Sequence, residues 1–516
     1  MENMQSTLAL SARRLTAWRP SPPRLSAMAG VWLAAVLLAV LCGMALAVEL
    51  YPVLLLLCAL IAGPVLLFYP RLGVWAVSIG ALCVAGLVDL YLPALSPVKW
   101  GIALLAIGLP FVASIGAVFQ RSTPGTQRLE QPAFLRWLLV FFLVFLVSTF
   151  GNWKGAVDAL GGLKSYFQVW GLVLAFCYIA YSEREASRFM RFLPLLGLLQ
   201  IPFVLHQFLV LVPMRTGLQD AMHGIVAVDI VAGTFGGSMK GGGRSSSLAL
   251  LAVICFALVL ARWRVGEISG KRLGLFSLAF LAPLALCEAK IIIVLIPLAV
   301  FFVFRDRILF NPVKAVAGAI AVALLVFAMF LGYSALPGAK GQRAASASED
   351  MTESIAYNFG EKGYGNSVLN RSSVYTFWWK ENAKPDTLFA LLFGTGPGEA
   401  NSSSLLRDDT LAAKRYAGYA IGLTGLSSML WELGLMGTLA VLILLSSAYR
   451  QANNLAAKWK DTAHWPLLKA AEVAIVLVVV NLAHNNYFVS DISFQTLLML
   501  VLGYLVAMTH IKRGLP

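Results

Sequence analysis

The chain has 516 residues, of which 59% are hydrophobic and only 13% are charged, and its mean hydropathy is +0.79. This composition excludes a string of soluble domains, because apolar stretches of about 17–22 residues, each long enough to cross a bilayer, recur along almost the whole chain. The net charge of +15 does not indicate nucleic-acid binding, since the basic residues are spread over loop ends instead of gathering on one face.

The apolar runs predict an all-α polytopic membrane protein with about fourteen transmembrane helices (12–14). A basic tail at 1–27 without a cleavable signal precedes them, and a second tail at 511–516 follows them. The positive-inside rule then places both termini in the cytoplasm. The predicted spans are 28–47, 51–69, 73–93, 99–119, 135–150, 166–182, 192–212, 245–262, 273–287, 290–304, 315–333, 418–446, 467–484 and 492–510.

Two charged residues, Glu288 and Lys290, interrupt the apolar run at 273–304. As one helix this run would be about 48 Å long, which exceeds even a tilted span. Each charge would also cost about 2.5–3.5 kcal/mol at the membrane centre. We therefore predict two short helices that meet at Glu288–Lys290 near the outer rim. This places the loop 213–244 and a larger loop, 334–417, on the outer side, with the last three helices at 418–510.

A loop of about 80 residues in a compact membrane protein is normally functional. The outer side also collects the residues that suit binding of a diphosphate-linked sugar, for which Arg and Lys are donors, aromatic rings are stacking surfaces and His or Glu is a general base. The candidate residues are Arg215, Lys240, Arg244, Lys290, Arg371, Trp378, Trp379, Gly396, Gly398, Arg407, Glu432 and His484.

Each candidate also fits a structural role. Arg244 would anchor the next helix, Glu288–Lys290 would form an ion pair in a tight turn, Trp378–Trp379 would be interfacial anchors, and His484 would be a satisfied interfacial histidine. The turn GTGPGEANSSS lacks the Lys-Ser/Thr of a P-loop, so nucleotide binding is not expected. The sequence has no Asp-X-Asp and no His/Asp/Glu cluster with metal spacing, and we expect neither a metal nor a cofactor.

Three stretches resemble the O-antigen ligase and polymerase superfamily of bacterial membrane proteins. They are GTFGGSMKGGGRSSSLALLAV, LCEAKIIIVLIPLAVFF, in which Lys290 replaces the family's arginine, and NRSSVYTFWWKENAKPDTLFALLFGTGPGE…LTGLSSMLWELGLMGTLAVLIL. The third stretch follows the family's order of an arginine, aromatics, a glycine turn and a Glu-x-Gly-x-x-Gly helix. It maps the motif to Arg371, Gly394, Gly396, Gly398, Glu432, Gly434 and Gly437. The resemblance covers about 213–446 and implies a GT-C-like membrane fold with a large periplasmic loop.

One departure from the family concerns its catalytic histidine. Family ligases carry a His-Asn shortly before the glutamate, where this chain has Leu423 and Thr424. We hypothesise that His484, which is followed by Asn485, supplies the imidazole from a neighbouring helix. Because ligases depend on the usual histidine and polymerases vary there, the departure favours a polymerase.

The resemblance implies a bacterial inner-membrane polysaccharide polymerase, a metal-independent glycosyltransferase whose substrate is an undecaprenyl-diphosphate-linked oligosaccharide. An O-antigen ligase that acts on lipid A core or another acceptor is the first alternative. A flippase for lipid-linked oligosaccharides is the second, although it should place its cations deep within spans. Expected partners are the lipid-linked substrate, membrane lipids, and a chain-length regulator and flippase of the same pathway, without nucleic acid.

Overall fold

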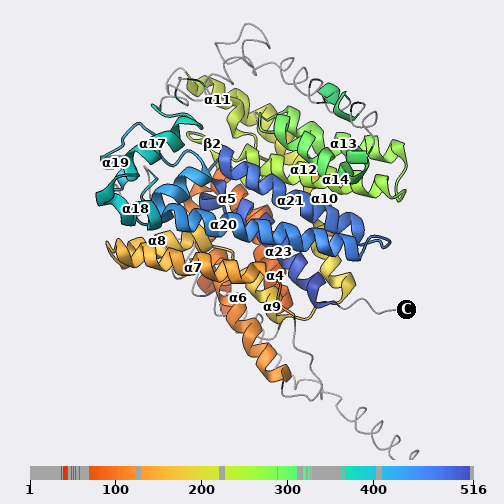
Figure 1. Cartoon of the computed structure of the whole chain (residues 1–516), viewed down its shortest axis with the longest axis horizontal. Coiled ribbons are helices and arrows are strands. Elements are labelled where there is room, and N and C mark those ends of the chain that lie inside the picture. Colours follow the sequence, from red (N-terminus) through yellow and green to blue (C-terminus); the bar gives the residue numbers. More distant parts are fainter. Residues whose placement is uncertain are drawn as a thin grey trace, which may run out of the picture. The chain divides into compact units, whose positions relative to one another are not determined.

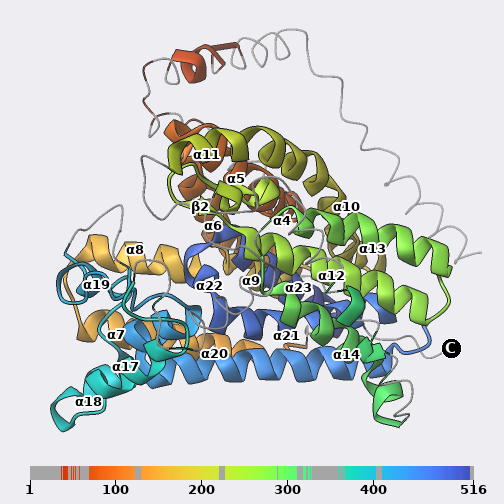
Figure 2. The same ribbon diagram turned by 90° about the horizontal axis from the view of Figure 1, so that it is seen from above.

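The computed structural model describes residues 69–121, 130–219, 227–287, 289–310, 367–401 and 409–511, with scattered residues of 36–57, 316–327 and 360–363. The chain divides into two units, 1–65 and 66–516, and the following description concerns the second. The protein is mostly helical (78%), with one two-stranded sheet in the described part (Figures 1 and 2). The prediction of an all-α membrane protein is confirmed at this level.

Helices follow one another along the described chain with short connections. The α-helices are α4 (Pro70–Ile79), α5 (Ala85–Tyr91), α6 (Val98–Arg121), α7 (Phe134–Gly151), α8 (Ala156–Phe167), α9 (Gly171–Tyr178), α10 (Glu183–His206), α11 (Val212–Gln219), α12 (Ser245–Arg264), α13 (Gly270–Ala285), α14 (Ile292–Phe310), α17 (Ser373–Asn382), α18 (Leu388–Phe393), α19 (Leu411–Lys414), α20 (Gly425–Lys458), α21 (Trp465–His484), α22 (Tyr487–Ser490) and α23 (Ile492–His510). The π-helical turns are η1 (Gly80–Val84) and η3 (Gln207–Leu211). The 3₁₀ turns are η2 (Pro93–Leu95), η4 (Ala227–Ile230), η5 (Gly233–Phe235) and η6 (Pro385–Thr387), and the strands are β1 (Gly237–Ser238) and β2 (Gly242–Gly243).

Eight helices in the described ranges are long and apolar enough to cross a membrane, and the pair α8–α9, bent by 64°, makes nine if it is one span. The eight are Pro70–Tyr91, Pro93–Ile115, Phe134–Gly151, Glu183–Gly217, Ser245–Arg264, Gly425–Lys458, Trp465–His484 and Ile492–His510. They coincide with eight of the predicted spans, and the predicted span 166–182 falls on the bent pair. The predicted spans 273–287 and 290–304 correspond to helices α13 and α14, which are shorter or more charged than these eight helices. The predicted spans 28–47, 51–69 and 315–333 lie largely outside the described residues, so the number fourteen stays a prediction.

The apolar run at 273–304 forms two helices, as its charges predict. Helix α13 ends at Ala285 and α14 begins at Ile292, so Lys290 lies in the connection between them. Both helices pack against α12. Glu288 itself lies outside the described residues, so its predicted ion pair with Lys290 stays a prediction.

Helices α12 and α23 form the centre of the bundle. In each, 94% of the most apolar stretch is buried inside the protein, against 28% for the span at 93–115. A helix that is apolar on all sides is suited to such a central position. Helix α21 packs against both, and α20 packs against α21 and α7.

Local sequence signals set several helix starts. Helix α10 begins at a capping box in which the Ser182 hydroxyl and the Glu185 carboxylate bind each other's backbone N–H. Thr424 and Ser427 form a similar box at the start of α20. The Asp491 carboxylate accepts hydrogen bonds from the first N–H groups of α23. Each such cap contributes about 1 kcal/mol to helix stability.

Helix α20 is broken at Gly434, where φ is +66° and ψ is −164°. The break frees backbone carbonyls that water cannot reach in a membrane, so other groups must bind them. The Trp431 carbonyl accepts the Thr395 N–H at 2.8 Å, and the Glu432 carbonyl accepts the Gly396 N–H at 3.2 Å. The Ser148 hydroxyl of α7 donates to the same Glu432 carbonyl at 2.7 Å. The turn after α18 is therefore joined to α20 through backbone groups.

This junction allows no side chain at two of its glycines. A Cβ at Gly434 would come 2.4 Å from the carbonyl carbon of Leu392, and a Cβ at Gly394 would come 2.2 Å from that of Glu432. Both glycines also have positive φ. The glycines of the GTGPGE and ELGLMG segments thus have a packing role, because two backbones cross there at close range.

We predict that Gly434→Ala destabilises the protein, since positive φ costs an alanine about 1–3 kcal/mol even before the Leu392 backbone moves. The apparent melting temperature in detergent should fall by about 5 °C or more. Gly108→Ala in α6 is the matched control, because no heavy atom lies within 4 Å of that added Cβ. It should melt within about 2 °C of the wild type. Equal melting temperatures for the two variants would contradict this account of the junction.

Candidate functional site

The loop 227–244 is folded against the bundle by two buried glutamines. The Gln207 side chain accepts the N–H groups of Ala232 and Gly233, at 2.9 and 2.7 Å, and donates to the Gly233 carbonyl at 2.7 Å. The Gln200 side chain accepts the Thr234 N–H at 2.7 Å. Strands β1 and β2 then form a small hairpin, in which Gly237 pairs with Gly243. The position of the loop is therefore fixed from inside the membrane domain.

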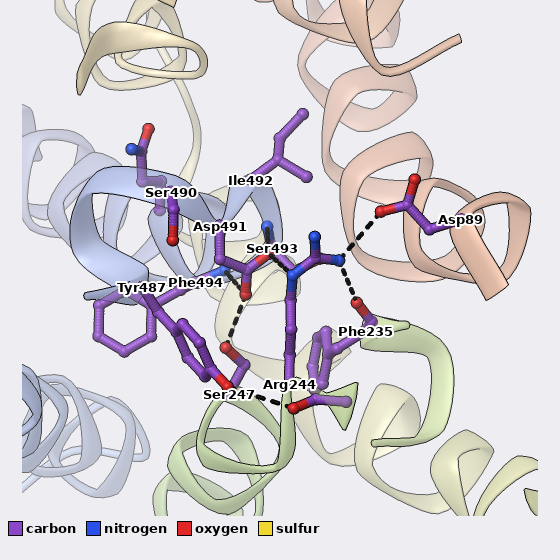
Figure 3. A network of polar contacts seen from close by, with 12 residues as sticks. Asp89, Phe235, Arg244, Ser247, Tyr487, Ser490, Asp491, Ile492, Ser493 and Phe494 are labelled. Carbon is purple, nitrogen blue, oxygen red and sulfur yellow. Dashed lines mark hydrogen bonds and ion pairs between the residues drawn. The ribbon is translucent and has the colours of Figure 1, made fainter. Parts of the chain in front are cut away.

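Arg244, at the end of this loop, lies between two carboxylates. Its guanidinium is 3.2 Å from Asp89 of α5 and 3.3 Å from Asp491 at the start of α23, and it also donates to the Phe235 carbonyl at 3.0 Å (Figure 3). Asp491 accepts the Ser247 hydroxyl at 2.7 Å as well (Figure 3). These contacts favour the structural alternative for Arg244, that of an anchor at the start of α12.

The two carboxylates keep Arg244 charged. Burial alone would lower the pKa of its guanidinium, but the neighbouring Asp491 and Asp89 raise that pKa above its ordinary value. Lys99 adds a second cation, 2.6 Å from Asp89. Arg244 and Lys99 thus share two carboxylates, and a third cation, Lys164 of α8, interacts electrostatically with both cations and with Asp89.

A second group of charges lies behind the hairpin, where Arg215 of α11 and Lys290 both interact electrostatically with Asp229. Arg215 is only 2% exposed, and its Nε and Nη1 have no hydrogen-bond partner in the part of the chain that the structure describes. Burial raises the pKa of the Asp229 carboxyl, although Arg215 and Lys290 oppose this shift. A buried guanidinium with unsatisfied donors is costly, and it indicates a place that an anion can occupy.

Arg371 and His484 are brought together from distant segments. The Arg371 Nε donates to the His484 backbone carbonyl at 2.8 Å, where α21 ends. The adjacent Asn485 carbonyl accepts the Gly425 N–H at 2.8 Å, so the start of α20 lies beside the same turn. The imidazole of His484 is partly buried.

Short contacts connect these groups through the loop 227–244. The Tyr487 hydroxyl, three residues after His484, donates to the Gly243 carbonyl at 3.2 Å. A Cβ at the preceding Gly242 would come 3.1 Å from the Asp229 carboxylate, which faces Arg215 and Lys290. The structure thus places three predicted cations, Arg215, Arg244 and Lys290, at the loop 227–244. It forms a separate pair from Arg371 and His484, which the hydrogen bond of Tyr487 connects to the same loop.

Glu432 lies in a different place and is bound internally. Its side chain is fully buried and accepts the Tyr166 hydroxyl at 2.8 Å and the Ala400 N–H at 3.0 Å. These bonds hold the segment after Gly396 and Gly398 against α20, and they favour a structural role for the carboxylate. Its predicted function as a general base stays a prediction without geometric support.

The aromatic pair of α17 is divided between core and surface. Trp378 is 3% exposed and lies in a cluster with Val374, Tyr416 and Trp431. Little of this ring is accessible to a sugar in this structure, which favours a structural role for Trp378, and its predicted binding role stays a prediction. Trp379 is 55% exposed, which is compatible with both of its predicted roles.

Of the two remaining candidates, one lies away from the site and the other is not described. Lys240 is exposed in the hairpin turn between β1 and β2. Arg407 lies outside the described residues. Among the residues that are described, no group of three or more His, Cys, Asp or Glu side chains could hold a metal ion.

Helix α18 shows that the outer segment 367–424 is not wholly hydrophilic. Its sequence is LFALLF, none of its side chains is buried, and Leu388 and Phe389 are exposed. It packs against α7 and α20, and the Phe389 ring lies so close to Gly151 that an added Cβ there would come 2.3 Å from it. An exposed apolar helix beside a membrane span is suited to the interface with lipid.

No protein-family model matches the chain, and no curated protein sequence matches it either. The function of the chain is therefore inferred from the chemistry of the residues around the loop 227–244 and from the sequence resemblance.

We predict that Asp491→Ala destabilises the protein, because it removes the cap of α23 and leaves Arg244 with one carboxylate. Breaking a buried ion pair costs about 3–5 kcal/mol, and the loss should appear as a lower melting temperature in detergent. The control is Asp409→Ala, which removes an exposed ion pair with Lys414 at 3.7 Å and should change stability by less than about 1 kcal/mol. An Asp491→Ala protein that melts like the wild type would show that the network is not structural.

Proposed function

We propose that this chain is a polysaccharide polymerase of the bacterial inner membrane. It would transfer a growing glycan from undecaprenyl diphosphate onto the next lipid-linked repeat unit at the periplasmic face. The observation that carries the proposal is that two cations, Arg215 and Lys290, interact with the partly buried Asp229 of the loop 227–244. The same loop accepts a hydrogen bond from Tyr487, which follows the contact between Arg371 and His484. The sequence resemblance to the O-antigen ligase and polymerase superfamily supports the same function.

The cations suit the diphosphate of the lipid carrier. The Nε and Nη1 of Arg215, which have no partner among the described residues, would each donate a hydrogen bond to a phosphate oxygen. Lys290 adds a compact charge on the other side of Asp229. Fixed cations of this kind stabilise the negative charge that grows on the departing lipid diphosphate. They do so without a metal ion.

His484 would act as the general base for the acceptor hydroxyl. In the transfer, the acceptor hydroxyl oxygen forms a bond to the anomeric carbon, and the bond from that carbon to the diphosphate oxygen breaks. The electron pair leaves with the lipid diphosphate, and a neutral imidazole takes the hydroxyl proton. Arg371 positions His484 through the 2.8 Å bond to its backbone carbonyl.

The charges within the spans favour the enzyme over the flippase. Lys469 and Glu472 of α21 bind each other at 2.8 Å, and Arg305 lies 3.4 Å from the same Glu472. They lie about 18 Å along α21 from His484, at the other end of the helix. The charges of α21 are thus paired with Arg305 and with one another, and they are remote from His484, whereas a transport path needs charges that the substrate can reach. Two charges in other spans, Asp89 and Lys99, pair with each other, and Asp89 also pairs with Arg244 at the loop 227–244.

We predict that Arg215→Gln, Lys290→Gln and His484→Ala each slow chain growth about 100-fold or more. The assay uses the full-length protein in liposomes, with lipid-linked repeats extracted from a strain that lacks it, and measures glycan length on gels. Lys414→Ala, which removes an exposed cation of the outer segment, is the control and should retain the wild-type rate within about twofold.

A strain that lacks this protein would distinguish a polymerase from a flippase and from a ligase. A polymerase predicts that single lipid-linked repeats accumulate on the periplasmic side, and a flippase predicts accumulation on the cytoplasmic side. A ligase predicts full-length glycan that is not joined to its acceptor. Wild-type growth rates in all three site variants would contradict the proposal.

The proposal also fixes the orientation of the chain. A thiol at the exposed position Lys380, introduced as Lys380→Cys, should react with a membrane-impermeant maleimide added to spheroplasts. The control is Lys271→Cys, at the start of α13, which should react only after the membrane is permeabilised. The opposite labelling pattern would place the cations and the lipid-linked substrate in different compartments.

A further inference from the structure

Helix α8 brings a lysine, Lys164, into the ion-pair network of Arg244 without a carboxylate of its own. The Lys164 ammonium lies 4.9 Å from the centroid of the Trp100 ring, which is a cation–π contact. It makes no hydrogen bond or ion pair with any residue that the structure describes. Its electrostatic neighbours are two other cations, Lys99 and Arg244, and the carboxylate of Asp89.

The two carboxylates of the network are already occupied by other groups. Asp89 accepts hydrogen bonds from the Lys99 ammonium, at 2.6 Å, and from the Ser96 hydroxyl, at 2.8 Å, in addition to its ion pair with the guanidinium of Arg244. Asp491 is fully buried, and it binds the same guanidinium and the first N–H groups of α23. Neither carboxylate binds the lysine of α8.

The network therefore contains three cations, Lys99, Lys164 and Arg244, against two carboxylates. Like charges repel one another more strongly in a partly desolvated site than in water. An anion bound among the three cations would offset this repulsion. Such an anion can reach them, because all three side chains are partly exposed, to 21% for Lys99 and 24% for Arg244.

The cations lie at the end of a span, at the level of the loop 227–244. Lys99 and Trp100 belong to the start of the span 93–115, and Arg244 is the last residue of the loop before α12. A tryptophan at the start of a span is suited to the headgroup level of a bilayer. A lipid whose tail lies in the bilayer presents its phosphates at this level.

This group of cations is separate from the cations at Asp229. Lys99 and Lys164 belong to α6 and α8, whereas Arg215 and Lys290 belong to α11 and to the connection between α13 and α14. Helix α11 packs against η4, which contains Asp229, and α8 packs against α22. The two groups thus contact the same loop but share no side chain.

We infer that Lys164, together with Lys99 and Arg244, binds the diphosphate of the acceptor lipid. Under the proposed polymerase function, on which this assignment rests, Arg215 and Lys290 bind the diphosphate of the donor. The donor diphosphate is bonded to the reacting sugar. The acceptor diphosphate is separated from the reacting hydroxyl by a whole repeat unit, so it needs a second cationic site at the membrane surface.

Binding of undecaprenyl diphosphate without a glycan tests the second site directly. The full-length protein is placed in phosphatidylcholine nanodiscs, and the bound carriers are counted by native mass spectrometry. We expect two carriers for the wild type and for Lys164→Arg, which keeps the charge, but one for Lys164→Gln. Arg215→Gln should also bind one carrier, and the double variant with Lys164→Gln should bind none. Lys384→Gln, which removes an exposed lysine 4.0 Å from Glu381, is the control and should bind two.

The stability of the carrier-free protein distinguishes a binding lysine from a structural one. Lys164→Gln should melt in detergent at the wild-type temperature or above it, because the substitution removes a cation that repels Lys99 and Arg244. A clearly lower melting temperature for Lys164→Gln than for Lys164→Arg would show that the lysine stabilises the fold, and it would overturn the inference.

The dependence of chain growth on substrate concentration tests the role of the site in the reaction. Lys164→Gln should raise the concentration of lipid-linked repeat at half-maximal rate about 10-fold. It should change the maximal rate by less than about threefold, because Lys164 does not touch the reacting atoms. Arg215→Gln should instead lower the maximal rate. An unchanged half-maximal concentration in Lys164→Gln would overturn the inference.

The binding count also separates this inference from the proposed function. A wild type that binds two carriers but joins no glycan would contradict the polymerase and keep the second diphosphate site. A wild type that binds only one carrier, or a Lys164→Gln protein that binds two, would overturn the site. Phosphatidylglycerol added at the mole fraction of the carrier should not displace the second carrier. Its displacement would identify a site for anionic phospholipids in general and would overturn the assignment to the acceptor.

Discussion

Arg244 lies between Asp89 and Asp491, and this ion-pair network connects three parts of the chain, of which the loop 227–244 is also bound by Gln200 and Gln207. It joins α5, the end of the loop 227–244 and the start of α23. Because α12 and α23 are the most buried of the candidate spans in the described chain, the network connects the centre of the bundle to the loop 227–244, where the proposed diphosphate-binding cations lie. The bonds of a buried charge network are directional, whereas apolar packing is not. The network therefore defines the position of the loop more than it raises the free energy of unfolding.

Several side chains that take no part in the proposed reaction hold the site in place. Gln200 and Gln207 hold the loop from below, and Glu432 holds the turn at 394–400 against α20. The break at Gly434 makes this possible, because it turns backbone carbonyls of a membrane helix toward donors from another segment. The catalytic proposal therefore assigns a small number of residues to the substrate and a larger number to keeping them in place.

Sequence alone predicted the parts of the fold that follow from apolar length and local signals. Eight spans and the interruption near Lys290 follow from the cost of burying charge, and both are seen. The tertiary neighbours of Glu432 and Trp378 could not be predicted, because hydropathy does not say which face of a helix meets which partner. Gln200 and Gln207 gave a signal that was missed. Two amides seven residues apart on one face of a membrane helix indicate a polar partner.

The apolar sequence of α18 affects how the outer segment 367–424 can be studied. None of its side chains is fully buried, and only Leu391 packs against the cluster that contains Trp378 and Trp431, while α7, α17 and α20 provide its helix contacts. If the segment were expressed without the membrane domain, Leu388 and Phe389 would face water and promote aggregation. The segment is thus not expected to fold as an independent soluble domain, and it would have to be studied with the bilayer present.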